Sequence, residues 1–198
     1  MRSFILAILI AAAWPTAHAQ SSLPPCPTDS SVVWTNCVGS ILRDDGAGYT
    51  GGWKDDKWHG QGLLISPKGH ALAEGVWRDD IATIAGDRYK YVEHTETQSF
   101  FVLIGSIRQE GTFRRAWIVN AYNEPQRKFG WMSGKLLERF DCTNERTQRL
   151  TASFFSGSFG SGELMDSVGE GEWEYVYPDS AGESVMKYVC GHKLPKNK

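Results

Sequence analysis

The chain has 198 residues, a formal net charge of −2 and an apolar content of 41%. This charge excludes the strongly basic balance typical of nucleic-acid-binding proteins, so no nucleic-acid partner is expected. Glycine (21 residues) and aromatic residues (12%) are abundant, and the mixture favours short β-strands joined by turns.

The N-terminus has the three parts of a secretory signal peptide. Arg2 precedes an apolar run at 4–14, and the small residues Ala17 and Ala19 stand where signal peptidase requires them. The run is shorter than the roughly 20 residues that cross a bilayer. No cysteine stands at the first mature position, as a lipoprotein would require. We therefore expect residues 1–19 to be a signal peptide and the protein to be periplasmic or secreted.

The exported chain keeps four cysteines: Cys26, Cys37, Cys142 and Cys190. An even number in an oxidising compartment is typical of disulfide bonds. Four cysteines allow three pairings, and their count alone leaves all three open. No C-x-x-C spacing and no closely spaced histidine pair occurs, so no metal site is expected.

An internal repeat follows a Ser-, Pro- and Thr-rich leader at 20–36. Its positions recur at offsets of 23 or 24 residues as the pairs Gly39/Gly62, Gly46/Gly69, Gly51/Gly75, Trp53/Trp77, Asp55/Asp79 and Asp56/Asp80. A period between about 20 and 50 residues indicates stacked supersecondary units. Within one unit, a strand at 49–53, a polar turn at 54–57 and a return strand at 59–65 predict a β-hairpin. Alternating glycines let neighbouring hairpins approach closely.

One full unit and two partial ones share a recognisable set of residues. These are Tyr49, Gly51, Trp53, His59, Gly60, Gly62, Gly69, Gly75 and Trp77. Over residues 39–80 this pattern resembles the MORN repeat (membrane occupation and recognition nexus), and we assign 37–80 to a MORN-like hairpin array. Fewer than about three stacked units are seldom stable alone, so we expect the array to be stabilised by the neighbouring domain.

Beyond residue 80 the repeat stops, and a different set of elements is predicted. Strand-like runs lie at 90–94, 99–107, 113–120, 131–142, 151–155 and 172–177. Ser180 and Glu183 form a capping box that predicts the start of a helix, and Gly191 predicts its end. The glycine-rich segment 157–163 predicts a flexible connection between two strands.

Several strings of this second half follow a family pattern. They are the stretch 101–107, Arg115 with Trp117, Ser133 with Asp141 and Cys142, and the W-x-x-V-x-P-x-S string at 173–180 ahead of Cys190. Over 87–192 they resemble the surface-adhesin protein E family. The resemblance implies a Gram-negative envelope domain with an antiparallel sheet, a C-terminal helix against it and a disulfide. Gly105 departs from the pattern, where aspartate is expected, and residues 193–198 form a tail.

The resemblance also bears on the cysteine pairing. Cys142 and Cys190 both match the family pattern, and they end a predicted strand and the predicted helix, so we expect them to be bonded. Cys26 and Cys37 lie outside the pattern and pair by elimination.

The sequence gives little indication of an enzyme. No motif of a serine hydrolase, metalloprotease or nucleotide-binding enzyme occurs, and no catalytic residue or cofactor is predicted. Glu170, Glu172 and Glu174 alternate, which places them on one face of a strand. Paired carboxylates can hydrolyse glycosides. Such an enzyme should show a concave pocket with two close carboxylates, at least one with a raised pKa.

The sequence therefore predicts a mainly β protein, a short MORN-type β-hairpin array followed by an α+β domain. The predicted function is a non-catalytic envelope protein that binds a protein or glycan partner in the envelope or the host matrix. The alternatives are an enzyme acting on envelope polysaccharide and a structural module that self-associates as a homodimer. The segment 108–149 holds nine Lys and Arg against five Asp and Glu, so an anionic membrane surface is a further candidate partner.

We expect the mature N-terminus at Gln20. The intact mass of the exported protein measures this directly, and soluble protein that retains Met1 would contradict it.

Overall fold

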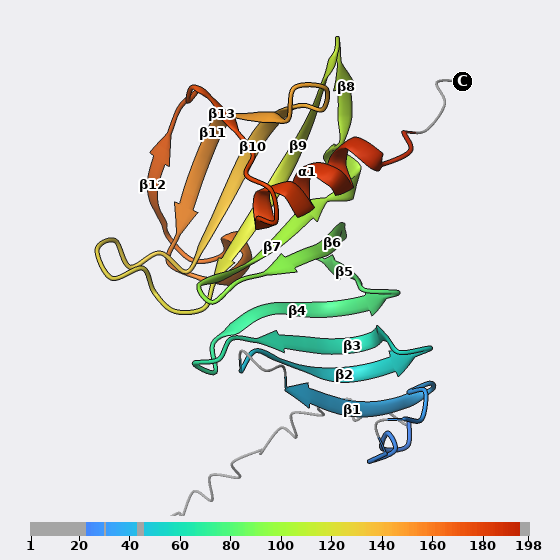
Figure 1. Ribbon diagram of the computed structural model, residues 1–198. Helices are drawn as coiled ribbons and strands as arrows, with labels where there is room; N and C mark the ends of the chain where they lie inside the picture. The colour runs from blue at the N-terminus through green and yellow to red at the C-terminus, as the bar shows by residue number, and fades with distance from the viewer. Residues whose placement is uncertain (1–22, 30, 43–45, 195–198) are drawn as a thin grey trace, which may run out of the picture.

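The computed structural model describes residues 23–29, 31–42 and 46–194, so the signal cleavage site lies outside the described residues. Over these residues the chain forms one antiparallel sheet of thirteen strands with a single α-helix against one face (Figure 1). The predicted fold class, mainly β with an antiparallel sheet and a C-terminal helix, is confirmed.

The strands follow one another across the sheet almost in chain order. The first part contains β1 (Cys37–Leu42), β2 (Gly48–Lys54), β3 (Lys57–Ile65), β4 (Ala71–Arg78) and β5 (Ile81–Ile84). The second contains β6 (Asp87–His94), β7 (Gln98–Leu103), β9 (Phe113–Tyr122), β10 (Ser133–Asp141), β11 (Arg146–Phe155) and β12 (Leu164–Val168). The short strands β8 (Arg108–Glu110) and β13 (Trp173–Tyr175) pair with β9 and β11. Because β5 pairs with β6, no break in the sheet separates the two parts.

The hairpin turns of the array repeat in detail. Both Asp-Asp turns, at 55–56 and 79–80, have positive φ at each residue, which is the geometry of a type I′ turn and one that aspartate tolerates. The second aspartate of each turn accepts a hydrogen bond from the backbone N–H of a tryptophan in the preceding unit: Asp56 from Trp34 (2.7 Å) and Asp80 from Trp58 (3.0 Å). The repeat in the sequence is therefore matched by a repeat of the same hydrogen bond.

Tryptophan and glycine form the core of the array. The indole N–H groups of Trp53 and Trp77 donate to the carbonyls of Gly39 and Gly62, each at 3.1 Å. The Tyr49 ring lies directly over Gly62, where a β-carbon would overlap it, so only glycine fits there. All three aromatic side chains are almost fully buried.

The aromatic contacts continue from the array into the second part. Trp58 contacts Tyr91 (ring centroids 5.1 Å apart), Tyr91 contacts Phe101 (5.5 Å), and Phe101 contacts Phe159 (4.9 Å). We call the run of rings from Trp34 to Phe159 the aromatic column. Phe159 belongs to a short 3-10 helix, η2 (Ser158–Gly160). The segment 157–163, predicted as a flexible connection, instead contains this short helix, and the partly buried Phe159 ring packs against Tyr89 and Phe101.

The helix packs on the opposite face of the sheet. α1 (Ala181–Gly191) begins at the predicted cap, where the Ser180 hydroxyl accepts a hydrogen bond from the backbone N–H of Glu183 (3.2 Å), and it ends at Gly191. Its buried residues are Val185, Met186 and Val189, which pack against Val102, Ile118 and Phe140 of the sheet. Neighbouring strand residues Phe101 and Val119 belong instead to the core that contains the aromatic column. One sheet therefore separates two cores.

Two disulfides join the ends of these elements. Cys26 bonds to Cys37 at the start of β1, and Cys142 after β10 bonds to Cys190 in α1. These are the pairs expected from the sequence. The first holds the leader against the array, and the second fixes the helix to the sheet.

The two disulfides should contribute unequally to stability. They close loops with sequence separations of 11 and 48 residues, for which the chain-entropy model gives about 3 and about 4 kcal/mol. Replacing Cys142 and Cys190 together by alanine should lower the Tm more than replacing Cys26 and Cys37, as measured by circular dichroism. An equal or reversed order would show that the helix is held mainly by its apolar contacts.

Candidate functional site

The repeat signature residues do not form an exposed binding surface. Tyr49, Trp53 and Trp77 are between 1% and 6% exposed, and their partners are other residues of the array. Half-buried His59 lies near Asp79, with its Nδ1 3.8 Å from a carboxylate oxygen. The positions of these signature residues indicate a structural role, so they are not candidates for a ligand-binding surface.

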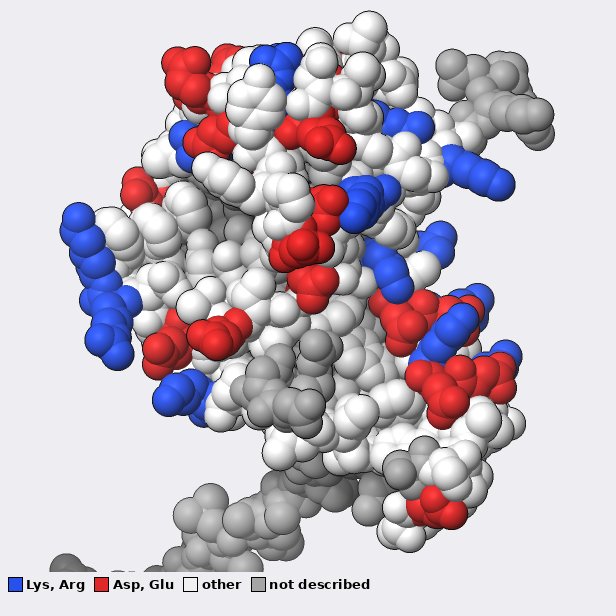
Figure 2. Space-filling view, in the orientation of Figure 1, with Lys and Arg blue, Asp and Glu red and all other residues white. Residues whose placement is uncertain are grey.

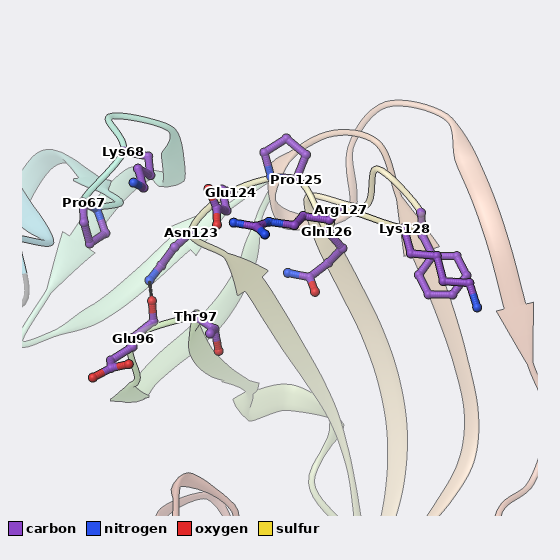
Figure 3. Close-up of a pocket in the computed structure, with 11 residues that line it drawn as sticks. Pro67, Lys68, Glu96, Thr97, Asn123, Glu124, Pro125, Gln126, Arg127 and Lys128 are labelled. Carbon is purple, nitrogen blue, oxygen red and sulfur yellow. Dashed lines mark hydrogen bonds between the residues drawn. The ribbon is translucent and has the colours of Figure 1, made fainter.

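A pocket of about 380 Å³ lies where the hairpin array meets the second part of the sheet (Figure 3). Three segments line it: the turn after β3 (Pro67 and Lys68), the turn after β6 (Glu96 and Thr97) and the loop 123–129 between β9 and β10. We call it the junction pocket. Its volume falls in the range of about 300–1,000 Å³ typical of ligand-binding pockets. The loop lies within the basic segment 108–149 singled out in the sequence, but no lining residue was predicted individually.

Asn123 anchors the floor of the junction pocket. It is only 3% exposed, and its side-chain Nδ2 donates to the carbonyls of Thr95 (3.3 Å) and Glu96 (2.8 Å). These two acceptors fix the orientation of the amide. Its Oδ1 atom is buried and has no hydrogen-bond partner among the described residues. A buried acceptor without a partner costs about 1–3 kcal/mol of stability.

A stack of rings supports the loop that forms one wall of the junction pocket. Phe129 stacks on Trp131 (centroids 4.3 Å apart), and Trp131 stacks on Phe154 of β11 (3.9 Å). At the base of the loop, the backbone N–H of Gln126 donates to the carbonyl of Trp131 (2.9 Å). The loop is therefore fixed to the sheet by both side-chain and backbone contacts.

Four charged side chains of the junction pocket have no side-chain partner among the described residues. Figure 3 shows Arg127 extending from the loop toward the turn that carries Lys68. Glu96 and Glu124 add two carboxylates to the lining. Within the described part of the chain, none of these four side chains forms an ion pair or hydrogen bond with another side chain. Both signs of charge are therefore available to a ligand.

A second, smaller site lies on the face that carries the helix. Two adjoining hollows of about 130 and 110 Å³ share Glu138 and Thr147 in their linings. One reaches α1, and the other is lined by Glu172 and Glu174, two of the three carboxylates singled out in the sequence. Figure 2 shows that acidic side chains gather over this end of the sheet, whereas basic ones gather at the loop between β9 and β10.

The carboxyl group of Glu138 is strongly perturbed. Burial raises its pKa to about 7, the neighbouring charge of Arg149 acts against the rise, and that of Glu174 adds to it. The third predicted carboxylate, Glu170, accepts a hydrogen bond from the side-chain amide Nε2 of Gln148 at 2.9 Å. A carboxyl group with a raised pKa beside other carboxylates is a feature that the enzyme hypothesis predicts. The two hollows, even taken together, fall short of the size of typical ligand pockets.

Other kinds of site are not found in the part of the chain that the structure describes. Over residues 23–29, 31–42 and 46–194, no three His, Cys, Asp or Glu side chains are grouped so that they could hold a metal ion. In the same ranges, no helix is long and apolar enough to span a membrane.

Comparison with known families gives the class of the protein. The family model described as surface-adhesin protein E matches residues 89–191, more than half of the chain. The chain therefore belongs to the surface-adhesin protein E family, and the resemblance of its second half is confirmed. The hairpin array lies outside the matched residues.

Two solved structures of Haemophilus influenzae protein E are similar to this chain. Crystal form II has 13% sequence identity and a TM-score of 0.41, and the match covers 52% of this chain and 87% of that chain. A second structure has 14% identity and a TM-score of 0.39, and the match covers 52% of this chain and 83% of that chain.

The raised pKa of Glu138 predicts a stability that depends on pH. The folded protein holds this proton more tightly than the unfolded chain, where the pKa of glutamate is about 4.3. The free energy of unfolding should therefore fall as the pH rises from about 4.5 to 7, by at most about 3 kcal/mol. Glu138→Gln should match the wild-type Tm at pH 5 and exceed it at pH 8.

Thermal unfolding of both proteins across this pH range measures the effect. Glu163→Gln, at an exposed position, serves as the control and should follow the wild-type curve. Parallel curves for wild type and Glu138→Gln would show that Glu138 ionises as freely in the folded protein as in the unfolded chain.

Proposed function

We propose that this protein is a non-catalytic, exported module that binds a macromolecule of the cell envelope or the host matrix through the junction pocket. Membership of the surface-adhesin protein E family supports a binding role. The observation that carries the choice of site is a pocket of about 380 Å³ whose side chains Lys68, Glu96, Glu124 and Arg127 form no ion pair with one another or with any other described residue. The partner is a protein or a glycan.

In this proposal residues 37–80 are a MORN-type array that forms one wall of the binding site. The repeated indole-to-glycine and aspartate-to-tryptophan hydrogen bonds support the repeat assignment. The array contributes Pro67 and Lys68, whereas the family domain, placed at 87–192, contributes the other lining residues. Neither part alone would complete the pocket.

The cellular setting also belongs to the proposal. A signal peptide at 1–19 would direct the chain out of the cytoplasm, the leader at 20–36 would be held by the Cys26–Cys37 bond, and 193–198 would form a short tail. Export agrees with the two disulfides, which persist in oxidising compartments. A homodimer would present two junction pockets to one partner.

An enzyme acting on envelope polysaccharide is the second candidate. The raised pKa of Glu138 beside Glu172 and Glu174 favours it, because a general acid must stay protonated near neutral pH. The small volume of the hollows counts against it, since a polysaccharide chain needs a larger cleft. We therefore favour binding over catalysis.

Charge reversal at the junction pocket tests the binding proposal. Lys68→Glu with Arg127→Glu should reduce binding of the mature protein to immobilised envelope fraction or basement-membrane matrix by about tenfold or more, because charge-assisted contacts are lost. Lys57→Glu with Arg78→Glu is the matched control. It makes the same change in charge at exposed positions at the other end of the hairpins, and it should bind like wild type.

Two outcomes would contradict the proposal. Equal losses in both double variants would show that only net charge matters. Release of reducing ends from envelope polysaccharide by the wild type, abolished in Glu138→Gln, would instead support the enzyme.

A further inference from the structure

We infer that the junction pocket binds an acidic sugar, a pyranose that carries one carboxylate, as a unit of a larger glycan. The inference rests on the proposed function of the pocket and adds the chemical class of its ligand. It follows from the mixture of groups in the lining and from the place of the pocket in the fold.

The position of the pocket disfavours an extended peptide. An extended peptide gains most of its affinity by adding a strand to a free sheet edge. The junction pocket lies instead at the turns after β3 and β6 and at the loop after β9, all of which belong to strands paired on both sides. A ligand there must be recognised by side chains, so it must carry many polar groups of its own.

The polar groups of the lining match a ring with several hydroxyls. The carboxylates of Glu96 and Glu124 can each accept two hydrogen bonds or more. Sugar hydroxyls supply donors at this density. Pro67 and Pro125 add apolar surface to the lining, which the C–H groups of a pyranose can contact.

The two cationic side chains of the lining favour a ligand that carries one negative charge. Arg127 and Lys68 come from opposite walls, and neither has an ion-pair partner within 4.0 Å among the described residues. A guanidinium group binds a carboxylate through two parallel hydrogen bonds. Glu96 and Glu124 would repel a densely sulfated chain, so a ligand with one carboxylate per sugar fits the pocket better than a strong polyanion.

Isothermal titration of the mature protein with a galacturonate hexamer and with sialyllactose tests this inference. The two probes represent the two sources of such a sugar, a uronate chain and a terminal sialic acid. We expect at least one to bind, and a neutral cellulose hexamer to bind at least about tenfold more weakly. Arg127→Ala and Lys68→Ala should each weaken binding by about tenfold, whereas Lys57→Ala, at the opposite end of the same hairpin, should not change it.

The variant Glu124→Ala separates sugar recognition from simple charge attraction. If Glu124 accepts a sugar hydroxyl, its loss should weaken binding of the acidic sugar about threefold or more. If the pocket is only a basic patch, the same loss should strengthen binding of every polyanion, including heparin and poly-glutamate.

The inference is overturned if neither acidic sugar binds, if the neutral hexamer binds as tightly, or if poly-glutamate binds as tightly as the sugars. Loss of matrix binding in the charge-reversal variant with no sugar binding would leave the proposed function standing and remove only the sugar. Insensitivity of matrix binding to charge reversal would remove the proposed function of the pocket itself.

Discussion

The packing of aromatic rings over glycine is the contact on which the rest of the structure depends. Among the described residues, α1 contacts only strands of the second part and the short helix η2 reaches only β4 of the first part, so β1 to β5 bury their apolar face mainly with their own side chains (Figure 1). They do so because Tyr49 lies over Gly62 and because Trp53 and Trp77 reach the carbonyls of the preceding unit. Large rings beside positions without a β-carbon make a single-layer array compact.

The aromatic column also couples the array to the family domain. Rings continue from Trp58 through Tyr91 to Phe101 and Phe159, while the backbone ladder continues from β5 to β6. The Ser158 hydroxyl adds a hydrogen bond to the carbonyl of Ala71 in β4. The parts of the chain that line the junction pocket are therefore held together by the same contacts that fold the protein, which would preorganise the pocket for the proposed ligand.

The two faces of the sheet carry different chemistry because neighbouring residues of a strand point to opposite sides. On the face with the aromatic column, Phe159 packs against Tyr89 and Phe101. The other face is covered only in part by α1, which the Cys142–Cys190 bond fixes in place. Glu138 lies beside the covered area, where partial burial raises its pKa without enclosing a pocket large enough for a ligand.

Local signals in the sequence determined the hairpin period, the capped helix, the family of the second half and the cysteine pairs, because each depends on residues close together in the chain or on a family pattern. The short strands β5, β8 and β12 were missed, since strands of three to five residues give too little alternation to detect. Only the tertiary structure decided that Phe159 packs against the core, that burial raises the pKa of Glu138, and that Lys68, Asn123 and Arg127 line one pocket. These residues are far apart in the chain, and only the order of strands in the sheet brings them together.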